Sequence, residues 1–192
     1  MALSARFEAA LPFAAGLHRD QVRKGTNTPY VSHLLGVAAI VLEHGGNEDE
    51  AIAALLHDAV EDQGGASTLR AIHDRFGGAV AAIVAGCTDT DLVPKPPWRP
   101  RKEAYVTHVA SASPSVRLVS AADKLHNART ILADYRRHGD AVWERFSGGK
   151  EGSLWYYRAL VDAFRAHGRT PLLDELDRVV SEIERLAAGG PS

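Results

Sequence analysis

The chain of 192 residues is long enough for one domain with a sizeable core and short for two. Its hydrophobic fraction of 45% and charged fraction of 24% are typical of a soluble globular protein, and its formal net charge of -2 disfavours general nucleic-acid binding. The single cysteine, Cys87, excludes an intrachain disulfide, so the fold does not depend on an oxidising compartment.

Helical spacing of apolar residues dominates the chain, with Ala, Leu and Val recurring every three or four positions. Alternating β-branched runs, which would indicate strands, are scarce. The pattern predicts an all-α fold, a bundle of about ten helices. The predicted helices cover residues 4–22, 30–45, 48–62, 67–74, 77–88, 102–111, 114–136, 140–146, 151–167 and 171–187.

Two segments between these helices are predicted as loops. Residues 23–28, RKGTNT, are polar and contain a glycine, and residues 90–100, TDLVPKPPWRP, contain four prolines, which exclude a regular helix. We expect one domain over residues 1–187 and a frayed, disordered tail over residues 188–192.

No segment indicates targeting to a membrane. The N-terminal stretch carries Arg6 and Glu8 where a signal peptide needs an uninterrupted apolar run. The apolar runs at residues 37–42 and 79–85 are far too short to span a bilayer. We therefore expect a cytoplasmic protein with neither a membrane nor a nucleic acid as its partner.

The segment AIAALLHDAVED, residues 51–62, combines a largely apolar circumference with one polar arc. On a helical wheel at about 100° per residue, His57, Asp58, Glu61 and Asp62 fall within an arc of roughly 140°. Burying carboxylates beside a histidine is costly unless a positive charge compensates. Imidazole and carboxylate are both good ligands for divalent metals, so a bound cation is the simplest compensation. The alternative is a solvated helix end with an acidic patch.

Polar residues also interrupt apolar helices before and after this segment. His33 lies in PYVSHLLGVAAIV, where Ser32 joins it as a polar residue, and Asp123 lies in SVRLVSAADKLHNARTIL. Asn127 follows Asp123 by one helical turn, on the same face. The chain thus presents the order His, His-Asp, Asp on three separate helical segments.

This order resembles the HD superfamily of metal-dependent phosphohydrolases. Four stretches resemble the hydrolase domain of RelA/SpoT enzymes, and most closely the stand-alone small alarmone hydrolases that include the metazoan SpoT homologue. They are HRDQVRKGTNTPYVSHLLGVAAIVLEHGG, AALLHDAVEDQGG, RFGGAVAAIVAGCTDT and VRLVSAADKLHNART. The resemblance runs from His18 to Asn127 and more weakly through Tyr157. HDxxED, RK before PYxxH, and ADKxxN are more specific than HD alone.

The resemblance implies the fold, the metal and the reaction. It implies a single HD-type hydrolase domain in which His33, His57, Asp58 and Asp123 hold one Mn²⁺ ion, with other divalent metals as alternatives. It also implies a nucleotide substrate with a 3′-pyrophosphate. Removal of that group from ppGpp or pppGpp yields GDP or GTP and pyrophosphate.

Glu61 and Asp62 are the predicted catalytic residues. In the family, the matching carboxylates assist the attack of water. Glu61 is one turn from His57 and Asp58, so it can lie beside the ligands without being one. We expect Glu61 to act as general base and proton shuttle and Asp62 to orient the water. The alternative role is to support the metal ligands.

A doubly pyrophosphorylated nucleotide is strongly anionic, so its pocket should contain cations. Arg23 and Lys24 match the family's RK pair, which lies against the nucleotide. The predicted substrate-binding residues are Arg23, Lys24, Lys95, Asn127, Lys150 and Tyr156. The alternative for each cation is ordinary solvated surface, and for Tyr156 it is the core.

Two other histidines are set apart from the site. His73 forms a second HD dipeptide with Asp74, but the segment LRAIHDRF is strongly charged and is interpreted as an exposed face. His18 stands three residues before Gln21, where it either supports the site through a hydrogen bond or is a partly buried structural histidine.

Three functions stay open on the sequence alone. The first is a (p)ppGpp 3′-pyrophosphohydrolase, in a housekeeping or an antitoxin role. The second is an HD phosphatase acting on NADPH, ppApp or nucleoside monophosphates. The third is a non-catalytic nucleotide-binding HD protein, which the complete set of ligands and acidic residues disfavours. The oligomeric state is open.

Overall fold

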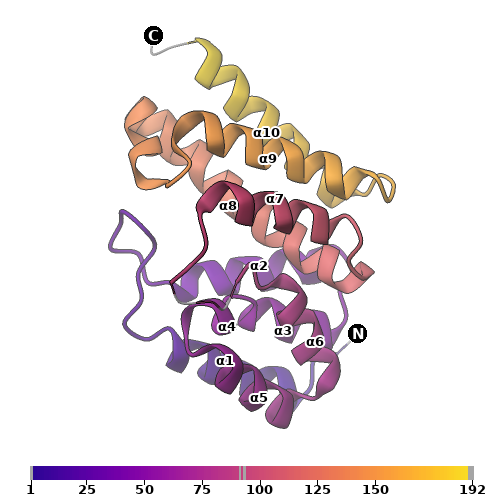
Figure 1. Ribbon diagram of the computed structural model, residues 1–192. Coiled ribbons are helices and arrows are strands. Elements are labelled where there is room, and N and C mark those ends of the chain that lie inside the picture. Colours follow the sequence, from indigo (N-terminus) through magenta and orange to yellow (C-terminus); the bar gives the residue numbers. More distant parts are fainter. Residues whose placement is uncertain (1, 91, 93, 190–192) are drawn as a thin grey trace. The chain divides into compact units, whose positions relative to one another are not determined.

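The computed structural model describes residues 2–90, 92 and 94–189, and their regular structure is helical (Figure 1). Within these ranges no strand forms, and one isolated antiparallel bridge joins Val22 to Pro29. The all-α prediction is confirmed. The elements are α1 (Ala5–Leu17), α2 (Val31–Glu43), α3 (Glu48–Leu56), α4 (Ala59–Asp62), α5 (Gly65–Phe76), α6 (Gly78–Cys87), α7 (Trp98–Val109), α8 (Pro114–His138), the 3-10 helix η1 (Gly139–Arg145), α9 (Gly149–Arg165) and α10 (Pro171–Gly189).

The chain divides into two compact units. The first comprises Met1–Lys95 and Ala112–Ala122, and the second comprises Pro96–Ser111 and Asp123–Ser192. The single domain expected over residues 1–187 stays a prediction. None of the described helices is long and apolar enough to cross a lipid bilayer.

Helix α3 forms the centre of the first unit. Its residues 51–56 are buried, and it packs against α1, α2 and α6. A capping box starts the helix: Asn47 Oδ1 accepts from the amide of Glu50 at 3.0 Å, and Glu50 Oε2 accepts from the amide of Asn47 at 2.7 Å. This fixed start and the apolar packing carry His57, the residue after the last helical turn, to a set position in the unit.

The continuous helix predicted over residues 48–62 is wrong, because the helix is interrupted at His57 and Asp58. In an uninterrupted helix the carbonyl of Ala54 would accept from the amide of Asp58. Here that carbonyl accepts from the His57 imidazole at 2.8 Å. The short helix α4 then restarts after Asp58, which is its N-terminal cap.

Helix α1 ends at Leu17, five residues before the predicted end at residue 22. The chain turns at His18, and the amide of Tyr30 donates to the carbonyl of Gln21 at 2.9 Å. The amide of Arg23 also donates to the carbonyl of Thr28, at 2.8 Å. These bonds close residues 21–30 into a loop, because pairing with a distant segment replaces the helical partners of those residues.

Helix α7 starts at Trp98, four residues before the predicted start at residue 102. Pro100 therefore lies in the first turn of a helix, where its missing N–H has no intrahelical partner to lose. Trp98 is accommodated by two glycines of the α9 region, since a Cβ on Gly148 would lie 2.6 Å from the indole and one on Gly152 would lie 3.1 Å from it. The loop predicted over residues 90–100 was therefore wrong for its last three residues, and its residues 91 and 93 lie outside the described residues.

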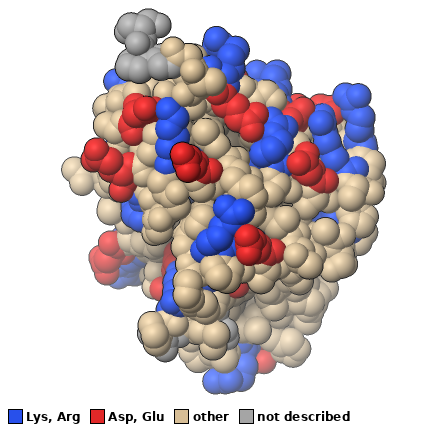
Figure 2. All heavy atoms as spheres, turned by 45° about the horizontal axis from the view of Figure 1, so that its top comes forward, with Lys and Arg blue, Asp and Glu red and all other residues tan. Residues whose placement is uncertain are grey.

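Helices α9 and α10 lie side by side in the second unit and meet through buried apolar faces (Figure 1). Arg158 of α9 reaches α10, where Nη1 donates to Asp177 Oδ1 at 2.5 Å and Nη2 donates to Glu184 Oε2 at 2.5 Å. On the face drawn in Figure 2, Lys and Arg side chains are interspersed with Asp and Glu. Helix α10 continues through Gly189, which corrects the start of the predicted tail at residue 188; residues 190–192 lie outside the described residues.

Candidate metal centre

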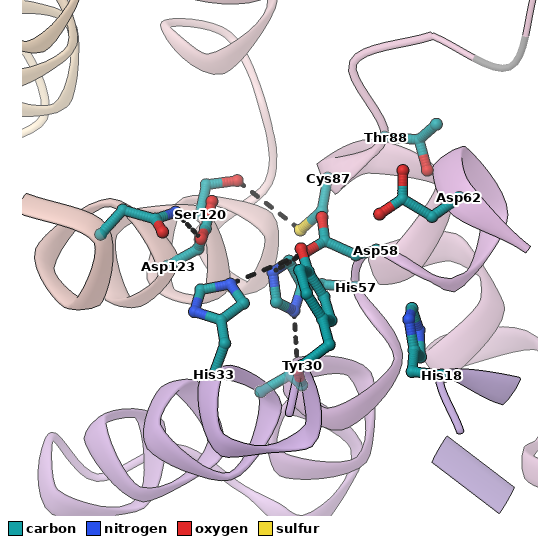
Figure 3. A network of polar contacts seen from close by, with 12 residues as sticks. His18, Tyr30, His33, His57, Asp58, Asp62, Cys87, Thr88, Ser120 and Asp123 are labelled. Atoms are coloured by element: carbon teal, nitrogen blue, oxygen red, sulfur yellow. Dashed lines mark hydrogen bonds and ion pairs between the residues drawn. The ribbon is translucent and has the colours of Figure 1, made fainter. Parts of the chain in front are cut away.

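Three of the four predicted metal ligands lie together in the first unit (Figure 3). His33 comes from α2 and is fully buried, while His57 and Asp58 form the junction between α3 and α4. One ligand atom from each of the three lies within 4.8 Å of the other two. The apolar packing of α2 against α3 brings the two imidazoles face to edge, with ring centroids 5.2 Å apart.

The spacing of these donor atoms fits a shared divalent cation. Asp58 Oδ2 lies 3.0 Å from His57 Nε2 and 3.6 Å from His33 Nε2. Two donors that are each about 2.1 to 2.2 Å from one cation stand roughly 3.0 to 3.6 Å apart, from octahedral to tetrahedral geometry. Two nitrogens and one carboxylate oxygen also suit first-row divalent metals.

A backbone contact orients the imidazole of His57. Its Nδ1 lies 2.8 Å from the carbonyl oxygen of Ala54, and a carbonyl can only accept. Nδ1 therefore carries a proton, which leaves Nε2, the nitrogen 3.0 Å from Asp58 Oδ2, as the one that can bind a metal.

Tyr30 contacts the cluster through its hydroxyl. Tyr30 Oη donates to Asp58 Oδ2 at 2.6 Å. The bond fixes the rotamer of Asp58 from a residue just before α2, so the start of α2 and the α3–α4 junction are tied together at the carboxylate.

Glu61 and Asp62 follow one turn later, on α4, and both are partly exposed. Lys95 Nζ donates to Glu61 Oε1 at 2.8 Å and lies 3.8 Å from Asp62 Oδ1. Gln21 Nε2 donates to Asp62 Oδ2 at 2.9 Å. The predicted catalytic carboxylates are thus joined by one predicted substrate-binding cation and by the loop after α1.

The two residues of the predicted RK pair differ in their exposure. The guanidinium carbon of Arg23 lies 5.7 Å from the centre of the Tyr30 ring, and Arg23 is partly buried. Lys24 is exposed on the loop. Of this pair, Arg23 therefore contacts Tyr30, which in turn donates to Asp58.

Asp123, the fourth predicted ligand, belongs to the second unit, and its role as a ligand stays a prediction. Its two oxygens accept from neighbours on α8: Oδ1 from Asn127 Nδ2 at 2.5 Å and Oδ2 from Lys124 Nζ at 2.7 Å. Burial lowers the pKa of Lys124, but Asp123, Tyr156 and Tyr105 outweigh it and raise that pKa well above its usual range. Asn127, predicted to lie one turn after Asp123 on the same helix face, does contact it.

The remaining predicted substrate contacts also lie in the second unit. Lys150 Nζ donates to both carboxylate oxygens of Asp140 at 3.1 Å. Tyr156 is buried, and the ammonium groups of Lys102 and Lys124 lie 4.9 Å and 6.0 Å from its ring centre. Tyr156 therefore lies in the core, which was the alternative to a substrate contact. Two lysine ammonium groups lie near its ring.

The second HD dipeptide is exposed, as predicted. The side chains of His73 and Asp74 are 64% and 78% exposed, and their polar atoms lie 3.4 Å apart on α5. Among the described residues, no further His, Cys, Asp or Glu joins these two in a group that could hold a metal ion.

Three residues near the predicted site were missed by the sequence interpretation. Tyr30 precedes His33 by three residues and so shares its side of the helix start, which is a signal that spacing could have provided. Lys124 neighbours Asp123 directly, but adjacent residues point to different sides of a helix, so its contact was not evident. Gln21 reaches Asp62 across 41 positions, and no local pattern indicates such a contact.

Comparison with known proteins identifies the family. Residues 10–154 match the HD domain. The chain belongs to the HD-domain family. This confirms the resemblance that the order His, His-Asp, Asp predicted, and the relatives below confirm the closer likeness to RelA/SpoT-type hydrolases.

Two curated relatives and one solved structure illustrate the likeness. The chain is 42% identical over 125 residues to guanosine-3′,5′-bis(diphosphate) 3′-pyrophosphohydrolase MESH1 of Xenopus tropicalis, covering 64% of this chain and 67% of that protein. It is 40% identical over 131 residues to the Homo sapiens protein of the same name, covering 67% and 70%. A solved metazoan orthologue of SpoT, described as hydrolysing ppGpp and playing a role in starvation responses, aligns with a TM-score of 0.78 at 28% identity, covering 95% of this chain and 97% of that one.

Proposed function

We propose that this chain is a metal-dependent guanosine-3′,5′-bis(diphosphate) 3′-pyrophosphohydrolase that converts ppGpp or pppGpp to GDP or GTP and pyrophosphate. The observation that carries the proposal is the cluster of His33, His57 and Asp58, with donor spacing that fits one cation. It occurs in a chain 40% identical to a protein named for this reaction.

His33, His57, Asp58 and Asp123 are the proposed ligands, and Mn²⁺ is the proposed ion. The assignment of Asp123 rests on the family resemblance and on its place in ADKxxN, where Asn127 and Lys124 each donate to one of its oxygens. Carboxylate and imidazole donors of this kind suit Mn²⁺ as well as its first-row neighbours.

The metal, when bound, would lower the pKa of a water molecule and polarise a phosphoryl oxygen. The protein's own groups then have two tasks. Glu61 takes a proton from the attacking water at a carboxylate oxygen and returns one to the ribose 3′-oxygen as its bond to phosphorus breaks, while Asp62 accepts a hydrogen bond that aligns the water. Gln21 and Lys95 keep the two carboxylates in place through the contacts at 2.9 Å and 2.8 Å.

The substrate brings negative charge that cationic side chains would bind. Arg23 and Lys24 are proposed to contact the nucleotide, and Lys95 its pyrophosphate, exchanging part of the contact with Glu61. Asn127, Lys150 and Tyr156 are further proposed contacts. A cytoplasmic location and a role in the response to starvation belong to the same proposal.

Product analysis with purified protein tests the reaction. The protein is incubated with Mn²⁺ and, separately, ppGpp, pppGpp, ppApp, NADPH and nucleoside monophosphates, and the products are resolved by ion-exchange chromatography. We expect ppGpp to yield GDP and pyrophosphate, with loss of activity in excess chelator and in Asp58→Asn.

Asp74→Asn is the matched control, because it alters the exposed HD dipeptide and leaves the cluster intact. It should retain wild-type activity. Release of orthophosphate from NADPH or a monophosphate, with ppGpp unchanged, would overturn the proposed substrate and support the alternative HD phosphatase. Nucleotide binding without turnover of any compound would support the non-catalytic alternative.

A further inference from the structure

His18 lies at the end of α1, almost fully buried, in contact with two residues that lead to the site. Its ring stacks on Tyr30, with centroids 5.2 Å apart and an angle of 18° between the planes. Its Nδ1 lies 2.6 Å from Gln21 Oε1. Tyr30 donates to Asp58 and Gln21 donates to Asp62, so one buried imidazole contacts a hydrogen-bond partner of each carboxylate. Figure 3 shows His18, Tyr30, Asp58 and Asp62 in the same region of the first unit.

The direction of these hydrogen bonds follows from Asp62, the acceptor at the end of the series His18, Gln21, Asp62. The carboxylate of Asp62 accepts, so the amide nitrogen of Gln21 must face it. The amide oxygen of Gln21 then faces His18, and it also accepts from Gln63 Nε2 at 2.8 Å. His18 Nδ1 must therefore carry the proton and donate it.

The side-chain amide of Gln21 cannot be turned over without losing hydrogen bonds. Turning its amide by 180° would set its oxygen against the Asp62 carboxylate and its NH₂ against the donor of Gln63. The Nε2 of His18 is buried with no hydrogen-bond partner among the described residues, so Nδ1 provides the hydrogen bond that the ring makes. The buried Nδ1–H of His18 has Gln21 Oε1 as its acceptor, so this hydrogen bond restricts the orientation of the Gln21 amide.

We propose that His18 is a positioning residue that sets the orientation of Asp62 through Gln21. The inference rests on the proposed function for its kinetic consequence, since Asp62 is a proposed catalytic residue. The hydrogen-bond direction itself requires only the contacts in the first unit. The imidazole touches neither substrate nor metal in this proposal.

Two replacements of His18 separate positioning from packing. His18→Asn can place an amide N–H where Nδ1–H stands, whereas His18→Leu keeps bulk and removes the donor. With ppGpp and Mn²⁺ we expect His18→Leu to lower kcat about tenfold, with KM changed less than about threefold, because misplacement by a fraction of an ångström slows chemistry more than binding. His18→Asn should recover most of kcat.

His73→Leu is the matched control, because it removes an exposed histidine of the same unit. If His18→Leu fails to fold, Gln21→Glu tests the same link, since it keeps the shape of the side chain and sets a second carboxylate against Asp62. It should lower kcat about tenfold or more. Equal kcat loss in the Leu and Asn variants, or kcat within twofold of wild type in all three, would overturn the proposal.

A second measurement does not depend on the reaction. Ring-nitrogen NMR of protein labelled with ¹⁵N-histidine, without metal or substrate, should show slowly exchanging Nδ1 protons on the buried rings of His57 and His18, and the His18 signal alone should be absent from His18→Leu. A proton on Nε2 with a bare Nδ1 would contradict the hydrogen-bond direction. If the wild-type protein leaves ppGpp intact, the proposed substrate fails, and this spectrum still decides whether the network exists.

Discussion

At the scale of single residues, His57 and Asp58 each have a partner that limits the movement of the side chain. The His57 ring is held by the Ala54 carbonyl and Tyr30 donates to Asp58. An ionised carboxylate in a mostly apolar unit is costly on its own, and hydrogen bonding together with a cation offsets that cost. Ligand geometry therefore depends on residues that would not themselves bind a metal.

Replacing the proposed base should separate chemistry from metal binding. Glu61→Gln keeps the shape of the side chain and removes its ability to take a proton, so we expect kcat for ppGpp to fall by about 10² to 10⁴. Mn²⁺ affinity, measured by titration calorimetry, should stay within about threefold of wild type because Glu61 is not a proposed ligand. A large loss of Mn²⁺ affinity would instead make Glu61 a ligand.

At the scale of elements, helices are fixed relative to one another by close contacts of glycines and by charged pairs. Gly148 at the start of α9 leaves room for Trp98 of α7, and Arg158 joins α9 to α10. Both features lie within the second unit. They determine how α7, α9 and α10 pack, and each can be tested by stability measurements.

Alanine at position 148 should destabilise the protein. Its Cβ would lie 2.6 Å from two ring carbons of Trp98, and a large ring cannot move aside cheaply, so we expect Gly148→Ala to lower the free energy of unfolding by about 1 to 3 kcal/mol. Gly16→Ala is the control, because its Cβ would meet nothing within 4 Å on α1 and should stabilise the helix by roughly 0.5 kcal/mol. Urea unfolding of both variants gives the comparison.

The stabilising effect of Asp177 should depend on pH. Burial raises the pKa of Asp177, but Arg158 and Arg165 outweigh it and hold that pKa below 3.8. A lowered folded-state pKa adds stability that is fully present above 3.8 and is lost as the pH falls through the folded-state value.

Asp177→Asn should therefore be less stable than wild type at pH 6, by about 1 kcal/mol, with the difference shrinking below pH 4. Thermal unfolding followed from pH 6 to pH 3 measures this difference. In an Arg158→Met background the substitution should cost less at pH 6. A difference that stays constant with pH would contradict the assignment.

At the scale of the whole molecule, metal binding should raise the free energy of unfolding and the Tm. A ligand that binds only the folded state adds about 2.7 kcal/mol at a hundred times its Kd. For a chain of 192 residues this corresponds to a rise in Tm of roughly 5 to 10 °C. We expect that rise with Mn²⁺ relative to chelator in wild type and in Asp74→Asn, and its absence in Asp58→Asn. An equal rise in Asp58→Asn would place the metal elsewhere.

The sequence by itself determined the helical class and the residues around which a site could form. Apolar residues at helical spacing persist through both units, so the fold class follows from local periodicity. The HDxxED segment stood out because its polar residues share one side of a mostly apolar stretch. The charged surroundings of His73 likewise indicated an exposed dipeptide, because exposure follows from local composition.

Only the tertiary structure decided how those residues meet. The donation of Tyr30 to Asp58 and that of Gln21 to Asp62 join positions 28 and 41 residues apart, which no helical period relates. Periodicity predicts which face of a helix is buried, whereas hydrogen bonds between elements depend on where the chain returns in space. Local sequence patterns therefore indicate the principal residues of the site, but they do not indicate the residues of other elements that orient them.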